Sequence, residues 1–296
     1  MTQTGTSETR LSSWRILLSN PVTVVSGALL VLVALIAVTA TWITPYGIND
    51  IDVPDALQGP SAAHWFGTDE LGRDVLSRVL VAIQASLQVA VVSVVFAAVV
   101  GVTVGLVAGY WGGWLDAVFM RIVDVMFAFP VLLLALAVVA ILGPGVTTTI
   151  LAIGIVYTPI FARVARASTL SVRVEPYVAA SRTMGTGHAY ILRHHILPNI
   201  AGPLIVQTSL SLAFAILSEA ALSFLGLGIQ PPQPSLGRMI FDSQGFVTLA
   251  WWMAVFPGVA IFLTVLAFNL FGDGLRDVLD PKQRTIAETR KTGGST

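Results

Sequence analysis

The chain contains no cysteine, and charged residues make up only 11% of its 296 residues. The absence of cysteine excludes disulfides, thiolate catalysis and cysteine-ligated zinc. Soluble domains carry about 25% charged residues, whereas this chain is 55% hydrophobic, with a mean hydropathy of +0.82. Its formal net charge is zero, so no basic excess points to nucleic acid. The composition therefore indicates an integral membrane protein rather than a soluble enzyme.

Long gaps between charged residues mark the segments that can cross a membrane. A spanning helix needs roughly 20 apolar residues, and a turn signal, Gly143-Pro144-Gly145, divides the longest gap. Backbone groups in lipid must be hydrogen-bonded within the structure, which favours helices for runs of this length. The sequence predicts an all-α polytopic membrane protein with six transmembrane helices, at 22–43, 87–110, 125–142, 146–162, 200–224 and 251–272.

The distribution of basic residues predicts the orientation of these helices. With the N-terminus inside, thirteen of the 16 Lys and Arg residues fall in cytoplasmic segments, and only Arg73, Arg78 and Arg238 fall outside. Both termini are therefore expected in the cytoplasm. The predicted organisation is a cytoplasmic segment 1–21, a membrane domain 22–272 and a cytoplasmic tail 273–296. Within the domain, 44–80 and 225–249 are outer loops and 163–199 is a cytoplasmic loop.

Motifs for catalysis and nucleotide binding are missing from the chain. There is no glycine-rich P-loop motif, and no Ser/His/Asp set is placed for nucleophilic catalysis. The four histidines, His64, His188, His194 and His195, include no pair at the i, i+4 spacing that binds metal on a helix, so no metal site is expected. The residues alone thus predict a six-span protein that lacks an ATP site of its own.

The cytoplasmic loop 163–199 carries its own structure signals. Glu175 and Pro176 suit the start of a short helix that ends at Gly185, a good left-handed stop. Thr186 is predicted to cap a second short helix, which ends before Pro198. Two interpretations of this basic loop stay open: it docks a cytoplasmic partner, or its helices lie on anionic lipid.

The outer loop 44–80 ends in an amphipathic pattern. Thr68 is predicted to cap a helix with an acidic first turn, and Leu71, Val75 and Val79 then share one face. Trp65 and Phe66 before it suit the membrane interface. An interfacial anchor is the favoured interpretation, and a rim that meets an extracytoplasmic partner is the alternative.

Three features of the predicted spans concern packing and polarity. Gly101, Gly105 and Gly109 make one flat face that lets another helix approach closely. Arg121 and Asp124 have the spacing of an ion pair on a helix. Glu219 is the only charge well inside a span, and it is interpreted either as lining a pathway or, preferably, as a brace for the Pro231–Ser235 turn.

Three segments together resemble a known family. They are FGTDELGRDVLSR at 66–78, EAALSFLGLG at 219–228 followed by Pro231-Pro232, and the loop 175–198. The chain resembles the inner-membrane permease subunits of binding-protein-dependent ABC importers, specifically the C-type permease of the dipeptide/oligopeptide branch. In that family's cytoplasmic coupling motif, Ala179, Ala180 and Ser181 stand at the triplet, Gly185 at the glycine, and Leu197-Pro198 at the close. The triplet glutamate is replaced by Ala179, and the isoleucine position holds His195.

The resemblance implies a type I ABC importer permease fold in the bacterial cytoplasmic (inner) membrane. It implies a non-catalytic half-channel that pairs with a B-type permease, two ATPase subunits or domains that bind ATP and Mg, an extracytoplasmic binding protein and a peptide substrate. Nickel, haem or another small solute remains the alternative cargo, and a self-contained channel or membrane-embedded enzyme is a more distant alternative.

The resemblance also assigns expected roles to residues. The ATPase-coupling set is Glu175, Pro176, Tyr177, Ala179, Ala180, Ser181, Gly185, His188, Leu197 and Pro198. The outer set on the binding-protein side is Thr68, Asp69, Gly72, Arg73, Asp74 and Arg78.

The predicted topology can be tested with one engineered cysteine, because the chain has none of its own. We expect a cysteine at Ser61, in the first outer loop, to react with a membrane-impermeant maleimide added from outside intact cells. Labelling only from the cytoplasmic side would contradict this topology.

Overall fold

A computed structural model describes residues 20–279 of the chain. Most of the predicted cytoplasmic segments 1–21 and 273–296 lies outside these residues. Helices make up most of the described part, and an isolated antiparallel bridge joins Thr68 and Asp74 within the 44–74 loop. The helices are α2 (Pro21–Ile43), α3 (Val75–Trp111), α4 (Gly113–Phe127), α5 (Val131–Leu142), α6 (Val146–Val172), α7 (Pro176–Thr183), α8 (His188–Ile191), α9 (Leu197–Phe224), α10 (Leu236–Asp242) and α11 (Trp252–Leu279).

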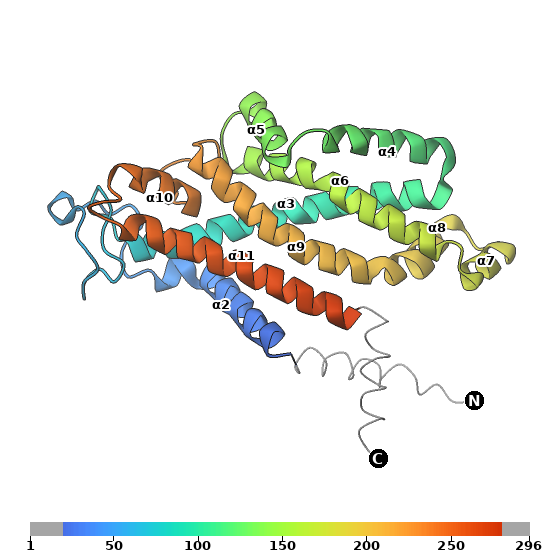
Figure 1. Cartoon of the computed structure of the whole chain (residues 1–296), viewed down its shortest axis with the longest axis horizontal. Coiled ribbons are helices and arrows are strands. Elements are labelled where there is room, and N and C mark those ends of the chain that lie inside the picture. The colour runs from blue at the N-terminus through green and yellow to red at the C-terminus, as the bar shows by residue number, and fades with distance from the viewer. Residues whose placement is uncertain (1–19, 280–296) are drawn as a thin grey trace, which may run out of the picture.

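Five helical segments of the described chain are long and apolar enough to cross a membrane, and a bent pair of helices gives up to six. The five correspond to predicted spans, but their ends extend further. α3 begins at Val75 and α6 continues to Val172, because both helices run on past the apolar stretch into polar sequence. Figure 1 shows α3, α6, α9 and α11 running along the long axis of the molecule.

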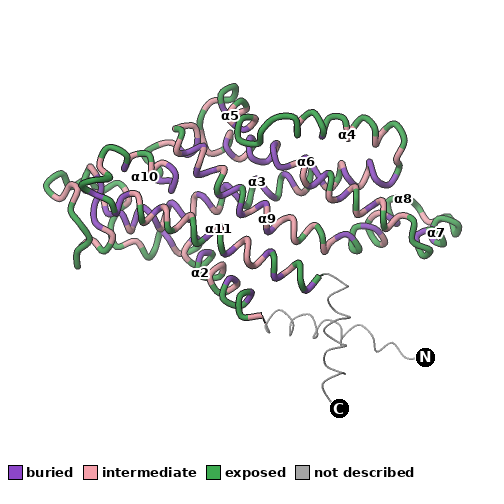
Figure 2. Tube along the Cα trace, viewed as in Figure 1, coloured by how far each residue is buried: buried purple, intermediate pink, exposed green. Residues whose placement is uncertain are grey.

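The predicted third span, a single helix over 125–142, is wrong. The chain is already helical from Gly113, and α4 and α5 meet at an angle of 92° across residues 128–130. Pro130 explains the break, since proline has no N–H to donate and disfavours helical geometry in the residue before it. α4 is exposed along nearly its whole length in the isolated chain (Figure 2).

Charged residues inside α4 explain why a pattern of uncharged runs does not reveal where this helix begins. Asp116 accepts two hydrogen bonds from Arg166 of α6, at 2.5 and 2.6 Å. Asp124 pairs with Arg163 of α6 at 2.8 Å. The predicted pair between Arg121 and Asp124 is therefore wrong, because Asp124 is bound to the neighbouring helix instead.

The glycine face of α3 packs against α6 of the same chain. A Cβ at Gly101 would lie 2.5 Å from the carbonyl oxygen of Thr158, and one at Gly109 would lie 2.8 Å from Cβ of Thr169. A Cβ at Gly105 would overlap the carbonyl oxygen of Ala162. Small residues let the two backbones touch, and such close packing is one of the forces that associate helices in lipid. The predicted packing role is confirmed, and its partner is identified as α6.

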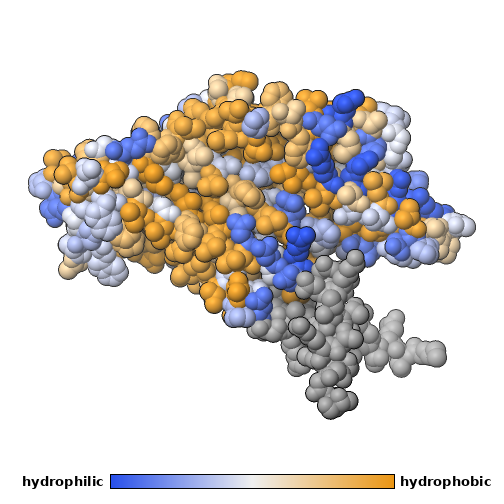
Figure 3. Space-filling model, viewed as in Figure 1, coloured by the Kyte–Doolittle hydropathy of each residue, from blue (hydrophilic) through white to orange (hydrophobic). Residues whose placement is uncertain are grey.

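Polar segments gather at the two ends of the bundle. The 44–74 loop and α10 lie at one end, and α7 and α8 lie at the other (Figure 1). Thr23 of α2 lies against Gly274 of α11, and Gly27 lies against Phe271, so the first and last described helices pack antiparallel, side by side. Apolar side chains cover most of the middle of the visible face, and hydrophilic ones gather toward α7 and α8 (Figure 3).

Candidate functional site

A cap formed by the 44–74 loop closes the end of the bundle where α3 begins. Asp74 is the N-cap of α3, and its Oδ2 accepts from the backbone N–H of Ser77 at 2.8 Å and from the Ser77 hydroxyl at 2.7 Å. His64 lies 3.0 Å from the other Asp74 oxygen. The carboxylate therefore satisfies two donors at the helix start and fixes the loop to it.

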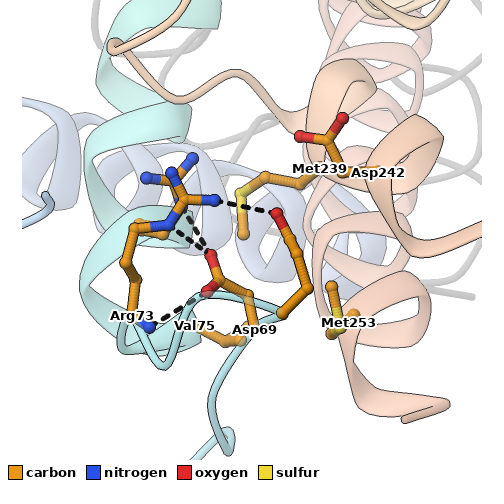
Figure 4. A pocket seen from close by; sticks show the side chains of 8 residues that line it. Asp69, Arg73, Val75, Met239, Asp242 and Met253 are labelled. Carbon is orange, nitrogen blue, oxygen red and sulfur yellow. Dashed lines mark hydrogen bonds and ion pairs between the residues drawn. The ribbon is translucent and has the colours of Figure 1, made fainter. Parts of the chain in front are cut away.

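Asp69 and Arg73 form the charged centre of this cap. The guanidinium of Arg73 donates to Asp69 at 2.6 Å and to Glu70 at 3.1 Å, and Arg78 lies 3.6 Å from Asp69 (Figure 4). Burial raises the pKa of the Glu70 carboxyl above its ordinary value, and the neighbouring Asp69 raises it further. Arg78 also donates to the carbonyl of Ile48 at 2.9 Å. These bonds hold a turn with few apolar residues in one conformation.

Thr68 does not cap a helix, so that prediction is wrong. Its side chain is buried and accepts from the N–H of Gln58 at 2.9 Å, and Trp252 donates to its carbonyl at 3.0 Å. The residues after Thr68 form a turn closed by Asp69, and α3 begins only at Val75. The real cap, Asp74, fits the same N-cap preference, but tertiary contacts decide between the two candidates.

The predicted outer-rim side chains are mostly inside the cap. Thr68, Asp69, Asp74 and Arg78 are each no more than 5% exposed. A partner at this end therefore meets other side chains, whereas the predicted set gives the cap its shape. Trp65 is 70% exposed and lines an open groove of about 750 Å³ that also touches the end of α2.

Glu219 lies at the centre of a buried polar cluster. It is 0% exposed, and its two oxygens accept from Ser86 of α3 at 2.6 Å and from Ser223 at 2.7 Å. The hydroxyl of Ser235, which caps α10, also hydrogen-bonds to it. Ser223 in turn accepts from the N–H of Ile229 at 3.2 Å. One carboxylate thus links α3, α9 and the loop between α9 and α10.

The geometry of this cluster differs in one respect from the predicted brace. Among residues 20–279, no backbone group of the loop bonds to Glu219 directly. Ser223 connects the carboxylate to the loop, and Ser235 connects it to α10. The sequence gives no local signal that Ser86 of α3 belongs to this site, because it lies 133 positions from Glu219.

The predicted coupling motif forms a helix pair with a glycine corner. α7 begins at Pro176 and ends before Gly185, which has φ +77° as predicted. The Cβ that a larger residue would add at Gly185 meets nothing within 4 Å. The corner therefore depends on the backbone conformation that glycine permits, and not on close packing.

The second half of the pair differs from the prediction. Gly187 rather than Thr186 is the N-cap of α8. α8 then runs through a π-helical turn, Leu192–Ile196, directly into α9, so it does not end before Pro198. The wider turn accommodates the missing N–H of Pro198 without a break. The corner is consequently joined to a single helical stretch, His188–Phe224.

The predicted coupling residues divide into two groups. Tyr177, Ala179 and Ala180 lie on the exposed side of α7 together with Glu175 and Pro176. Ser181 is buried, and its hydroxyl lies 3.2 Å from Nε2 of His195. Val178 and Ile191 are fully buried and attach the pair to the bundle. The exposed side stays available to another molecule.

The histidines take part in protein contacts. His64 pairs with Asp74, His188 lies 2.8 Å from the hydroxyl of Tyr110, and His194 stacks on Tyr190. Within residues 20–279 there is no group of three metal-ligating side chains.

The fold and the helix–glycine–helix corner define the class, a multi-pass membrane permease of an ABC importer. The chain belongs to the family described as binding-protein-dependent transport system inner membrane component, whose model matches residues 101–285. Residues 11–60 also match the N-terminal transmembrane domain of oligopeptide transport permease C. The resemblance seen in the sequence motifs is confirmed, and the chain is a multi-pass inner-membrane protein.

Similar proteins include two transport permeases. The chain is 45% identical to the dipeptide transport system permease protein DppC of Alkalihalophilus pseudofirmus, over 94% of this chain and 92% of that protein. It is 46% identical to the glutathione transport system permease protein GsiD of Escherichia coli, over 91% and 89% respectively.

Solved structures show the same fold. An inward-facing MetNI methionine ABC transporter chain matches with a TM-score of 0.58 and 20% identity, over 69% of this chain and 97% of that chain. A chain of an amino acid ABC transporter with histidines matches with a TM-score of 0.50 and 18% identity.

The buried cluster predicts different outcomes for two substitutions of Glu219. We expect Glu219→Gln to assemble and transport nearly normally, because serine hydroxyls can rotate to donate to, or accept from, an amide. Glu219→Leu leaves the three serine hydroxyls without their acceptor, at a cost of about 1–3 kcal/mol, and should lose assembly. Size-exclusion yield of the complex and uptake measure the two effects.

Ser86→Ala provides a graded comparison, since it removes one donor and leaves the other two bonds. Its yield should fall between those of Glu219→Gln and Glu219→Leu. Full assembly of Glu219→Gln together with loss of transport would contradict the brace and favour a role in the translocation pathway.

Proposed function

We propose that this permease forms half of the pathway of an ATP-driven importer of short peptides. A B-type permease completes the pathway, two ATPase subunits drive it and bind ATP and Mg, and an extracytoplasmic binding protein delivers the peptide. The observation that carries the substrate class is the 45% identity to a dipeptide permease over 94% of the chain. The glutathione permease relative supports the same class, since glutathione is itself a tripeptide.

We propose that the α7–α8 pair docks the ATPase subunits. Its outward side carries Tyr177, Met184 and Tyr190, which are 42%, 77% and 52% exposed. Exposed aromatic and methionine side chains of this kind are enriched in protein interfaces. Because α7 follows α6 and α8 continues into α9, a movement of the pair acts on two membrane helices at once.

At the opposite end, we propose that the cap receives the binding protein. The buried ion pairs of Asp69 with Arg73 and Arg78 keep its shape. Exposed apolar side chains such as Trp65 and Leu249, each 70% exposed, supply contact surface.

The glycine corner gives a prediction for coupling. Gly185→Val places a β-branched side chain at φ +77°, which costs about 1–2 kcal/mol. We expect the membrane helices to insert normally, because the site lies outside them. ATPase docking should weaken, or ATP hydrolysis should lose its stimulation by loaded binding protein. The measurement is reconstitution of the full complex in proteoliposomes, scoring ATPase retention, hydrolysis and uptake of tritiated dialanine.

Gly187→Val is the matched control, since φ −63° and ψ 145° suit a β-branched residue and no atom lies within 4 Å of its added Cβ. It should behave almost like the unmodified protein, and Gly187→Ala should be milder still. Normal coupling in Gly185→Val would refute the transmission role and leave a loop on the lipid surface. Uptake of nickel or haem with no uptake of dialanine or glutathione would refute the peptide substrate.

A further inference from the structure

Tyr110, the penultimate residue of α3, is a meeting point of three other elements. The residue is only 5% exposed, although it lies at the end of α3, next to the predicted coupling motif. Polar groups from the end of α6, from α7 and from α8 all reach it or its backbone. Neither the coupling motif nor the glycine face of α3 accounts for this arrangement.

The contact between Tyr110 and α8 fixes an orientation as well as a distance. The hydroxyl of Tyr110 lies 2.8 Å from Nδ1 of His188, the first residue of α8. The two rings are edge to face, with centroids 5.6 Å apart. A hydrogen bond combined with this ring geometry fixes both the distance and the rotation of α8 relative to α3.

Contacts from α7 and α6 surround the same ring. The guanidinium of Arg182, in α7, lies 4.7 Å from the ring centroid of Tyr110, within the range of a cation–π interaction. Arg173, which follows α6, donates to the carbonyl of Gly109 at 2.7 Å. The positive guanidinium there suits the C-terminal end of α3, where carbonyls lack helical partners.

An apolar layer lies beneath these polar contacts. Tyr110 packs in one buried cluster with Val178 of α7, Ile191 of α8 and Ala165 of α6. The inward side of the pair is therefore seated on the joined ends of α3 and α6, while its outward side stays exposed.

We propose that Tyr110 is a positioning residue that latches the α7–α8 pair to α3 through His188. This inference rests on the proposed coupling function. The covalent connections alone pass a movement of the pair to α6 and α9. The latch adds a direct bond between the pair and α3. The pair and the closely packed α3–α6 unit then turn as one body.

The central variant is Tyr110→Phe in the full importer complex. Phenylalanine keeps the apolar packing and the ring beneath Arg182 and removes only the hydroxyl. We expect normal ATPase retention, with the dialanine taken up per ATP hydrolysed reduced about three- to tenfold, the range expected for one lost hydrogen bond.

Variants of His188 separate the bond from packing. His188→Asn keeps a polar group near the Nδ1 position that can donate or accept, so its uptake-to-hydrolysis ratio should stay closer to that of the unmodified protein than the ratio of His188→Leu. His188→Leu should resemble Tyr110→Phe. The double variant Tyr110→Phe/His188→Leu should be no worse than either single variant, because both remove the same interaction.

A distance measurement tests the latch independently of any transport assay. Spin labels on cysteines at Thr103 of α3 and Ala180 of α7, both exposed, report the spacing of the two elements. Pulsed EPR should give one narrow distance distribution for the unmodified latch and a broader one for Tyr110→Phe.

The outcomes distinguish the latch from the function it depends on. If the unmodified complex shows ATP-driven dialanine uptake while Tyr110→Phe keeps the same ratio and the same distance distribution, the latch is refuted and the coupling function stands. If the unmodified complex shows no ATP-driven uptake, the proposed function fails and the latch's role in transmission fails with it.

Discussion

The close backbone contact between α3 and α6 is the constraint on which the rest of the structure depends. In lipid there is no hydrophobic force between helices, so association relies on tight packing and on paired polar groups. Gly101, Gly105 and Gly109 provide that packing against α6. The ion pairs of Asp116 and Asp124 with arginines of α6 then hold α4 alongside the joined helices.

α3 links the candidate sites because it passes all of them. Its 37 residues extend about 55 Å. Asp74 anchors its start in the cap, Ser86 binds Glu219, and Tyr110 meets the α7–α8 pair. A helix fixed at three depths can move as a rigid element, so a change at one end can reach the other.

Sequence patterns predicted the features that depend on local chemistry. Uncharged runs located five spans, and Gly185 has the positive φ expected of a helix stop. Errors arose where distant residues decide the outcome. Asp116 and Asp124 are tolerated within α4 because arginines of α6 pair with them, and Asp74 replaces Thr68 as the cap because Thr68 is bound by Gln58 and Trp252. The serines around Glu219 come from three elements that no local pattern connects.

Two glycine substitutions test most directly whether the α3–α6 contact governs the fold. Gly105→Ala and Gly258→Ala each add one methyl group inside a long helix, where alanine is favoured by about 1 kcal/mol. The Cβ at Gly105 overlaps the carbonyl of Ala162, whereas that at Gly258 meets nothing within 4 Å. Thermal unfolding of the purified permease should therefore occur at a lower temperature in Gly105→Ala and at an unchanged or higher temperature in Gly258→Ala. Equal unfolding temperatures for the two variants would contradict the account.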